Sequence, residues 1–327
     1  MARRLLSSLA LQASKPCLAQ RRATPPSFLR MATTPGPSKS KDAIVVGCVS
    51  YCDYIGDIWT GIAERFKSRG VPLDFVLFTN YDRQIESLLN GHIDIAWNGP
   101  VSHVRIQRRT NNTSISLGMR DTDQDFPSVV IASTRSGVTS LQGLVGKQIA
   151  AGTFDSPQAY ILPLHYISKT VPLKELDVVR FDRDVGKHGD TGIGEEEVIK
   201  AVAAGRADVG LLSKMMLDRA VAAGTLKEGD FTVVAQVESY DHCQFDALGT
   251  LPEAKKEAFL SALFAMDWEN PEDRPIMQKE GITRRWAETR EEGYNTTREA
   301  IADEPNVPFP PCMHPEDAHP FKSLTVL

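Results

Sequence analysis

The stretch that decides the fold is Leu73–Pro100, which reads LDFVLFTNYDRQIESLLNGHIDIAWNGP. It begins with an apolar run, Leu73–Thr79, and continues with a segment of helical periodicity, Arg83–Asn90, that Gly91 closes. A second apolar run, Ile93–Trp97, follows. An apolar run, a helix and another apolar run are typical of a βαβ unit, in which the two strands lie parallel in one sheet.

The same alternation extends on both sides of this unit. Upstream, Ala43–Cys48 predicts a buried strand and Ile58–Arg69 an amphipathic helix. Downstream, Ser128–Thr134 extends this first series as a strand, and a second series of strands and helices starts near Val138. We therefore expect an α/β fold of two lobes, each a mainly parallel sheet flanked by helices, joined by two hinge crossings. The expected division is lobe 1 at residues 42–137 and 239–302, lobe 2 at 138–238, and a Pro-rich, irregular tail at 303–327.

Ligands of parallel α/β sheets bind outside the carboxyl ends of the strands. The loops that follow the strands of the first series are Val49–Gly56, Asn80–Tyr81 and Asn98–Ser102. Candidate ligand-binding residues in these loops are Tyr51, Tyr81, Asn98 and Gly99.

Charge is distributed unevenly along the 327 residues. Eight Lys and Arg and no acidic residue lie in residues 1–41, which leaves 29 basic against 42 acidic residues in the remainder, a net charge of −13. A body this acidic argues against nucleic acid as a partner. No apolar stretch approaches the roughly 18 residues of a membrane-spanning helix.

Residues 1–41 predict an organelle-targeting segment. They are rich in Arg and Ser, and Met1–Lys15 can form a short amphipathic helix. This composition is typical of a mitochondrial transit peptide, with a plastid as the alternative destination. A disordered basic tail is the other interpretation, and a start at Met31 would leave a cytosolic form.

The five cysteines, at positions 17, 48, 52, 243 and 312, show no CxxC spacing. Scattered cysteines in a chain this long predict reduced thiols and not a disulfide framework. Neither a cofactor nor a bound metal is expected.

Four motifs carry a family resemblance. Asn80–Leu88 followed by Ile93–Pro100 resembles the phosphonate-binding proteins of bacterial ABC importers, with the same spacing. Similar matches are Ser136–Lys147, Asp155–Gln158 with Pro163, and Gly205–Val209, so that the resemblance spans roughly Val45 to Gly281. It implies a type II periplasmic-binding-protein fold whose two lobes close on a small anion.

The resemblance also implies site residues. Tyr81 matches a tyrosine whose hydroxyl contacts the phosphonate, Ser156 the first hydroxyl of an anion cradle, and Asp208 an acid that pairs with the ligand's amine. Ser156 also precedes Pro157, which suits a first helical position, and a helix N-terminus offers N–H groups to an anion. The structural alternatives are a plain N-cap for Ser156, a packed interface residue for Tyr81 and a turn acid for Asp208.

This sequence departs from the family pattern at three polar positions. Pro157 and Gln158 replace the second and third cradle hydroxyls, and Asn98 replaces a second ligand tyrosine. An oxyanion or carboxylate with a different side group therefore fits better than phosphonate itself, and Gln158 joins the candidate ligand-binding residues.

Two segments are unlike that family. The glycine-rich Val185–Glu196 places His188 in a loop before a helix, where it is a candidate ligand-binding residue. Ser239–Phe245 contains His242 beside Cys243, which is either a thiolate pair, part of a metal site with His188, or a buried small hydrophobe with a neighbouring histidine.

The leading functional hypothesis is a binding protein without chemistry of its own, which closes on a small anion by hinge motion. The alternative is an enzyme on the same scaffold, such as a pyrimidine synthase of thiamin biosynthesis or another lyase or transferase. Its reactive groups would be Cys243, His188, His242 and Glu195. The sequence does not say whether an importer partner exists.

Overall fold

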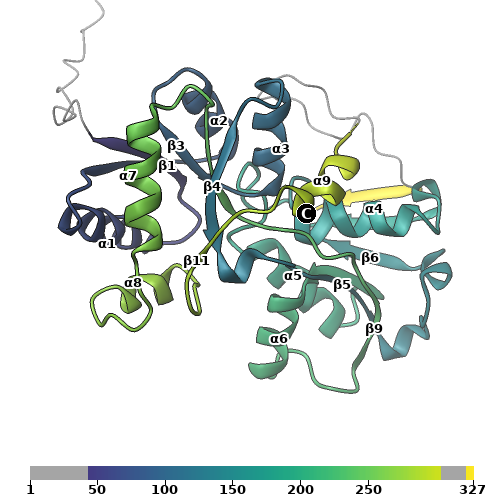
Figure 1. Ribbon diagram of the computed structural model, residues 1–327. Helices are drawn as coiled ribbons and strands as arrows, with labels where there is room; N and C mark the ends of the chain where they lie inside the picture. The colour runs from purple at the N-terminus through teal and green to yellow at the C-terminus, as the bar shows by residue number, and fades with distance from the viewer. Residues whose placement is uncertain (1–42, 303–321) are drawn as a thin grey trace, which may run out of the picture. The chain divides into compact units, whose positions relative to one another are not determined.

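The computed structural model describes residues 43–302 and 322–327. The expected targeting segment, residues 1–41, and most of the expected tail lie outside these described residues. Two six-stranded mixed sheets, each flanked by helices, make up the described part of the chain (Figure 1). This confirms the expected α/β fold class.

The first sheet has the strand order β11-β4-β10-β3-β1-β2. Strands β1, β2 and β3 are parallel, and β10 runs antiparallel between β3 and β4. The strands are β1 (Ile44–Val49), β2 (Leu73–Phe78), β3 (Ile95–Asn98), β4 (Ile115–Arg120), β10 (Gln244–Ala247) and β11 (Trp286–Ala287).

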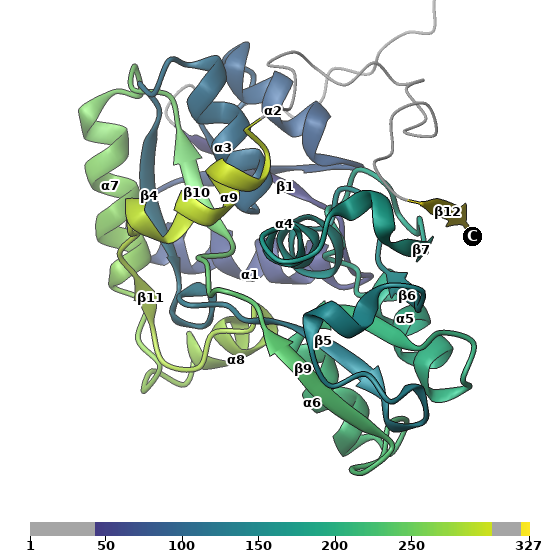
Figure 2. The same ribbon diagram turned by 90° about the vertical axis from the view of Figure 1, so that its right-hand side faces the viewer.

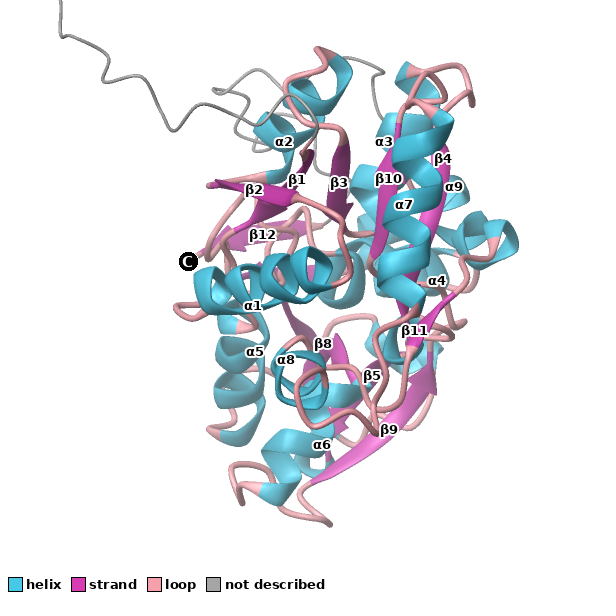
Figure 3. Ribbon diagram, turned by 60° about the vertical axis from the view of Figure 1, so that its left-hand side comes forward, coloured by secondary structure: helices cyan, strands magenta, loops and turns pink. Residues whose placement is uncertain are grey.

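Alternating side chains of this sheet enter two separate cores. Ile44, Val46 and Cys48 face a core shared with α1 (Ile55–Ser68) and α7 (Glu253–Phe264). Figure 3 shows α7 running across β10 and β4. Val45 instead faces the core of α2 and α3. The remaining helices of this lobe are α2 (Tyr81–Leu89), α3 (Pro100–Arg109) and α8 (Arg274–Lys279).

The second sheet has the order β12-β7-β6-β8-β5-β9. Its strands are β5 (Ser128–Ser133), β6 (Gln148–Ala151), β7 (Asp177–Arg180), β8 (Val209–Ser213), β9 (Phe231–Gln236) and β12 (Ser323–Val326). One face packs on α4 and the other on α5 and α6. The helices are a π-turn (Pro157–Ile161) that leads into α4 (Leu162–Ser168), then α5 (Ile193–Ala203) and α6 (Lys214–Ala222). A further helix, α9 (Asn295–Ala300), contacts both α3 of the first lobe and α4 of the second.

The structure corrects two expected boundaries. The first hinge crossing lies before Ser128 and not at residue 137, because β5 pairs antiparallel with both β8 and β9 of the second sheet. Figure 2 shows β5 beside β9. All six residues of β5 are buried, so this strand needs neighbours on both sides. The chain's last residues are also not irregular, since β12 pairs parallel with β7.

The two hinge crossings lie side by side. Phe126 and Tyr240 form an antiparallel bridge, and the backbone N–H of His242 donates to the carbonyl oxygen of Asp123 at 2.8 Å. Residues of both crossings are therefore held together between the two sheets. Among the described residues, no helix is long and apolar enough to cross a membrane.

Candidate functional site

Tyr81 joins the two lobes. It is the first residue of α2, three residues after the end of β2, and only 2% of it is exposed. Its backbone N–H donates to the carbonyl of Gly186 at 2.9 Å, and its hydroxyl donates to the carboxylate of Asp190. Gly186 and Asp190 belong to the loop between β7 and α5 of the second lobe. The carboxyl end of β2 thus meets the carboxyl end of β7, as the sheet rule predicts.

His188 lies on the Tyr81 ring. The two ring centroids are 4.5 Å apart at an interplanar angle of 21°. Burial lowers the pKa of His188 well below its usual value, and Arg105 and His242 lower it further. The imidazole is therefore neutral near pH 7, and it contributes a stacking surface and a hydrogen-bonding ring without a positive charge. We call Tyr81, His188 and Asp190 the inter-lobe cluster.

The loop that supplies His188 and Asp190 has an unusual backbone. Five residues between positions 184 and 192 have positive φ angles: Asp184, Gly186, His188, Gly189 and Gly192. Gly189 is required at its position, because a Cβ there would lie 2.4 Å from Oγ of Ser156. We call residues 184–192 the glycine-rich loop, and it packs directly on the predicted anion cradle.

Ser156 and Gln158 are both buried in this contact. The Ser156 hydroxyl oxygen accepts the backbone N–H of Ala159 at 3.1 Å, so it caps the π-turn as an N-cap residue does. Gln158 donates to the Glu195 carboxylate at 3.4 Å, while its own Oε1 atom has no partner. Glu195 in turn accepts the backbone N–H of Ser213 at 2.6 Å.

Tyr51 contributes from the loop after β1. Its hydroxyl lies 3.3 Å from the buried carboxylate of Glu280. Burial raises the pKa of Glu280 to about 7, although Arg120, whose Nη1 atom is 3.7 Å away, lowers it. Burial and Glu280 together raise the pKa of the Tyr51 hydroxyl well above its usual value, so Tyr51 acts as a hydrogen-bond donor.

The hinge crossings add three more polar side chains. His242 Nδ1 lies 3.0 Å from the Cys243 sulfur and 3.7 Å from the Asp123 carboxylate. Burial lowers the pKa of His242 to about 4, and burial together with Asp123 raises the pKa of the Cys243 thiol well above its usual value. The pair is therefore a neutral thiol beside a neutral imidazole.

Carboxyl groups dominate the electrostatics of this region. Burial raises the pKa of Asp190 to about 7. Arg120 holds Asp123 in a bidentate pair at 2.6 and 2.7 Å, so its positive charge is already balanced by that carboxylate. An anion that enters here must therefore displace or neutralise a carboxylate.

Two predicted ligand residues lie elsewhere. The amide nitrogen of Asn98 donates to Asp246 at 2.9 Å inside the first lobe, where β3 pairs with β10. Asp208 accepts the backbone N–H of Gln148, the first residue of β6, at 3.1 Å. It therefore lies at the amino end of that strand, opposite to the end that Ser156 follows. The sequence places Asp208 in a recognisable motif, but that motif is the turn between α5 and β8.

Gly99 occupies the N-cap position of α3, and no side chain caps this helix. Ser102, in the first turn of α3, has a buried hydroxyl without a hydrogen-bond partner. The start of α3 also packs against the second lobe, because Val101 belongs to an apolar cluster that Ile161 of the π-turn completes. Two helical N-termini, one from each lobe, therefore lie near the inter-lobe contact.

Four residues of this region are absent from the sequence-based candidates: Asp123, Arg120, Asp190 and Glu280. Asp190 lies in the glycine-rich segment that the sequence singles out, only two residues from His188. The other three lie in a 3₁₀ turn, at the end of β4 and just after α8, where no motif marks them.

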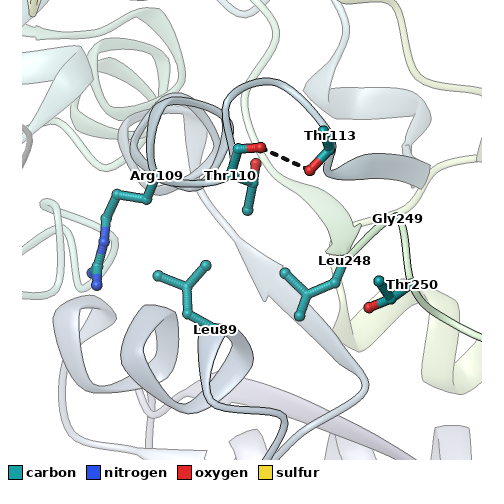
Figure 4. Close-up of a pocket in the computed structure, with 7 residues that line it drawn as sticks. All are labelled: Leu89, Arg109, Thr110, Thr113, Leu248, Gly249 and Thr250. Carbon is teal, nitrogen blue, oxygen red and sulfur yellow. Dashed lines mark hydrogen bonds between the residues drawn. The ribbon is translucent and has the colours of Figure 1, made fainter.

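A separate pocket of about 670 Å³ lies at the other end of the first sheet (Figure 4). Its lining includes Leu89, Arg109 and Leu248, and Thr113 donates a hydrogen bond to the carbonyl of Thr110 at its edge. Leu248 directly follows Ala247, which pairs with the first residue of β3. The pocket therefore lies at the amino ends of the parallel strands, away from the inter-lobe cluster.

Comparison with known proteins identifies the family of this chain. The family model of the periplasmic substrate-binding proteins of phosphonate ABC transporters matches residues 57–294. A curated relative, a probable ABC transporter phosphite-binding protein of Prochlorococcus marinus, is 21% identical over 206 residues, which cover 61% of this chain and 67% of the relative.

Solved structures show the same fold. The methylphosphonate complex of PhnD1 from Prochlorococcus marinus aligns with a TM-score of 0.63 and 18% identity, over 81% of this chain and 99% of that one. A binding-protein component of an ABC phosphonate transporter from Pseudomonas aeruginosa aligns with a TM-score of 0.57 and 16% identity, over 80% of this chain and 86% of that one. With nearly three quarters of its length matched by the family model, this chain belongs to the phosphonate-type periplasmic substrate-binding proteins of ABC transporters.

Proposed function

We propose that this protein binds a small oxyanion between its two lobes and that the lobes close on it by hinge motion. Family membership supports the solute-binding role, and the curated relative is named for phosphite. Tetrahedral oxyanions with a small or absent side group, such as phosphite and methylphosphonate, are therefore the first candidates.

The observation that carries the proposal is the double attachment of Tyr81 to the glycine-rich loop. Its backbone and its hydroxyl both bond to residues of the opposite lobe. A solute that accepts the Tyr81 hydroxyl while touching the N-terminus of the π-turn would therefore be held by both lobes at once. Helical N-termini favour anions through their free N–H groups and their dipole.

Asp190 sets the chemical condition for binding. Its carboxylate takes the hydrogen bond of Tyr81 that a solute oxyanion would need. The solute must therefore displace Asp190 from the Tyr81 hydroxyl, or bring a proton that Asp190 can accept. A monoprotonated oxyanion meets this condition better than a fully ionised one, because it donates one hydrogen bond of its own.

The neutral state of Cys243 and His242 argues against the alternative function, an enzyme that uses Cys243 as a reactive group. A cysteine nucleophile reacts as a thiolate, which forms where positive charge lowers its pKa. Here burial and Asp123 raise the pKa of Cys243, and its histidine partner carries no proton to stabilise a thiolate near pH 7. A binding role without covalent chemistry is therefore the better-supported function.

Family membership also suggests an ABC transporter as the partner that receives the solute. The basic, acid-free segment 1–41 supports delivery to mitochondria, with plastids as the alternative destination. Fusing residues 1–41 to a fluorescent reporter tests this delivery. A diffuse cytosolic signal would contradict it, and cleavage between about residues 30 and 41 would support it.

The binding function is tested by a thermal-unfolding screen of the full chain with phosphite, methylphosphonate, phosphate, sulfate and acetate. A bound solute stabilises the folded state by about 2.7 kcal/mol at a hundredfold excess over Kd. We expect stabilisation by at least one phosphorus oxyanion and none by sodium chloride at equal ionic strength. Equal responses to all salts would refute the proposal.

A further inference from the structure

The two hinge crossings bring three metal-ligating atoms together. Nδ1 of His242, Sγ of Cys243 and a carboxylate oxygen of Asp123 all lie within 4.8 Å of one another, and all three residues are buried. Asp123 comes from the first crossing, and the adjacent His242 and Cys243 come from the second. We call these three residues the hinge cluster.

The second nitrogen of His242 gives an independent sign of a ligand. The His242 side chain is 7% exposed, and its Nε2 atom is buried without a hydrogen-bond partner. This atom lies 3.9 Å from the Asp190 carboxylate. A histidine that binds a metal through Nδ1 carries its proton on Nε2 and commonly directs it at a carboxylate. Asp190 is the carboxylate that lies on that side of the His242 ring.

We propose that the hinge cluster binds one divalent transition-metal ion, with Nδ1 of His242, Sγ of Cys243 and an Asp123 oxygen as ligands. A thiolate, an imidazole and a carboxylate are typical ligands of Zn²⁺ and its neighbours, whereas Mg²⁺ and Ca²⁺ require mainly oxygen ligands. Binding releases the thiol proton of Cys243 to solvent.

The two distances from Nδ1 of His242 to the other ligand atoms are close to those that a tetrahedral ion needs. Bonds of about 2.3 Å to sulfur and about 2.0 Å to nitrogen separate these two atoms by roughly 3.5 Å. The nitrogen and sulfur are 3.0 Å apart, so Cys243 must move by about half an ångström. The nitrogen-to-oxygen distance of 3.7 Å needs a smaller adjustment in the opposite direction.

A bound ion would be balanced by its ligands. The thiolate of Cys243 and the carboxylate of Asp123 together carry two negative charges, which match a divalent ion. The positive charge of Arg120 faces Asp123 and the nearby carboxyl group of Asp190. The Arg120 side chain bonds to both Asp123 oxygens and the Arg120 backbone N–H also donates to Oδ2 at 3.3 Å, so Oδ1 is the oxygen that keeps a lone pair for the metal.

Three protein ligands leave a fourth tetrahedral position open, as in zinc sites that bind a water or a substrate. Asp190 lies 3.9 Å from Nε2 of His242 and accepts the Tyr81 hydroxyl, so it connects the hinge cluster with the region of the proposed solute. We infer that a solute oxygen can occupy the open position, a step that rests on the proposed function. The ion would then supply the positive charge that the carboxyl-rich site otherwise lacks.

Cobalt titration of the full chain, freed of metal with a chelator and kept reduced by a phosphine, tests the site. We expect one equivalent of Co²⁺ to produce a thiolate-to-cobalt absorption band in the near ultraviolet, and Zn²⁺ to abolish it. Cys243→Ser should remove the band, whereas Cys52→Ser, which changes a partly exposed thiol, should leave it intact. No band in the wild-type chain, or an unchanged band in Cys243→Ser, would overturn the proposal.

Asp190→Asn provides a second variant that keeps all three ligands. It should retain the band but weaken Co²⁺ binding about 10- to 100-fold, as expected for a carboxylate that orients a metal-bound histidine. Unchanged Co²⁺ affinity in this folded variant would contradict the assigned role of Asp190.

Methylphosphonate added to the cobalt-loaded chain separates the two proposals. A shift of the visible cobalt spectrum, with calorimetric binding, supports solute coordination to the metal. Calorimetric binding without a spectral shift overturns that coordination and leaves the proposed function intact. A cobalt band without any oxyanion binding leaves the metal site intact and contradicts the proposed function.

Discussion

The first lobe supplies its inter-lobe side chains from the ends of regular elements, whereas the second lobe supplies most of them from one loop. Tyr81 is the first residue of α2, and Tyr51 lies two residues after the end of β1. His188 and Asp190 instead belong to the glycine-rich loop, where five of nine residues have positive φ angles. The inter-lobe side chains of the first lobe therefore have fixed positions, and we call this surface of the first lobe the fixed wall. In the second lobe, the positions of the side chains depend on backbone conformations that few residue types adopt.

This difference predicts which residues determine ligand binding and which also determine the stability of the fold. Residues of the fixed wall are anchored by the two cores of the first sheet, so their substitution should change binding more than folding. Residues of the glycine-rich loop hold a strained conformation against Ser156 and Gln158, so their substitution should cost folding as well.

Gly189→Ala should have the largest effect on stability. Its φ of +77° costs a residue with a Cβ about 1–2 kcal/mol, and the new atom would lie 2.4 Å from the Ser156 hydroxyl, which adds about 1–3 kcal/mol. Urea unfolding measures the sum, about 2–5 kcal/mol. Gly224→Ala is the matched control, because its φ is +71° with nothing near the new Cβ, and it should lose only the smaller conformational part. Equal losses in both variants would show that the loop is not packed on Ser156.

The raised pKa of Glu280, which lies on the fixed wall, predicts that the stability of the protein depends on pH. Its folded pKa of about 7, raised from 4.5 mainly by burial against the opposing effect of Arg120, means that the folded state holds its proton more tightly than the unfolded state. Protonated Glu280 therefore contributes at most about 3 kcal/mol to the free energy of unfolding. This contribution is fully present below about pH 4.5 and is lost as the pH rises through 7. Urea unfolding at pH 5 and pH 8 should therefore show a smaller loss of stability with rising pH in Glu280→Gln than in the wild type. An equal loss of stability in the two proteins would contradict the assigned pKa shift of Glu280.

Ser156→Ala should have the smallest effect on stability, about 1 kcal/mol, because it removes one N-cap hydrogen bond. Ser213→Ala removes the equivalent cap of α6 in the same lobe, where Ser213 accepts the backbone N–H of Met216 at 3.2 Å. Both variants should lose similar stability, but only Ser156→Ala should also weaken oxyanion binding. Equal oxyanion affinities of Ser156→Ala and Ser213→Ala would show that Ser156 only caps the π-turn and does not bind the solute.

The fold could be predicted from the sequence because its signals are local. The stretch from Leu73 to Pro100 forms β2, α2 and β3 as its periodicity predicts. The misplaced boundary at residue 137 has a different origin. An apolar run such as Ser128–Ser133 predicts a strand but not the sheet that it joins, since that choice depends on its partners β8 and β9.

The site could be predicted only in part, for the same reason. Tyr81, Ser156 and His188 follow strands or lie in a glycine-rich segment, and such positions can be found from sequence. Asp123 meets Cys243 only because two crossings, more than a hundred residues apart in the chain, pair through their backbones. Asp208 lies in a familiar motif, yet the motif fixes only a turn, and the strand order decides at which end of the sheet it lies.

The most direct test of the account is calorimetric titration of methylphosphonate into the wild-type chain, Tyr81→Phe and Asp190→Asn. Tyr81→Phe removes one hydrogen bond to a charged group, so binding should weaken by about 1.5–3 kcal/mol. Asp190→Asn removes the negative charge that competes for the same hydroxyl, so the metal-free protein should bind the fully ionised solute more tightly. Opposite changes in Kd for the two variants are the predicted result. Unchanged affinity in both would show that the solute does not bind between Tyr81 and the glycine-rich loop.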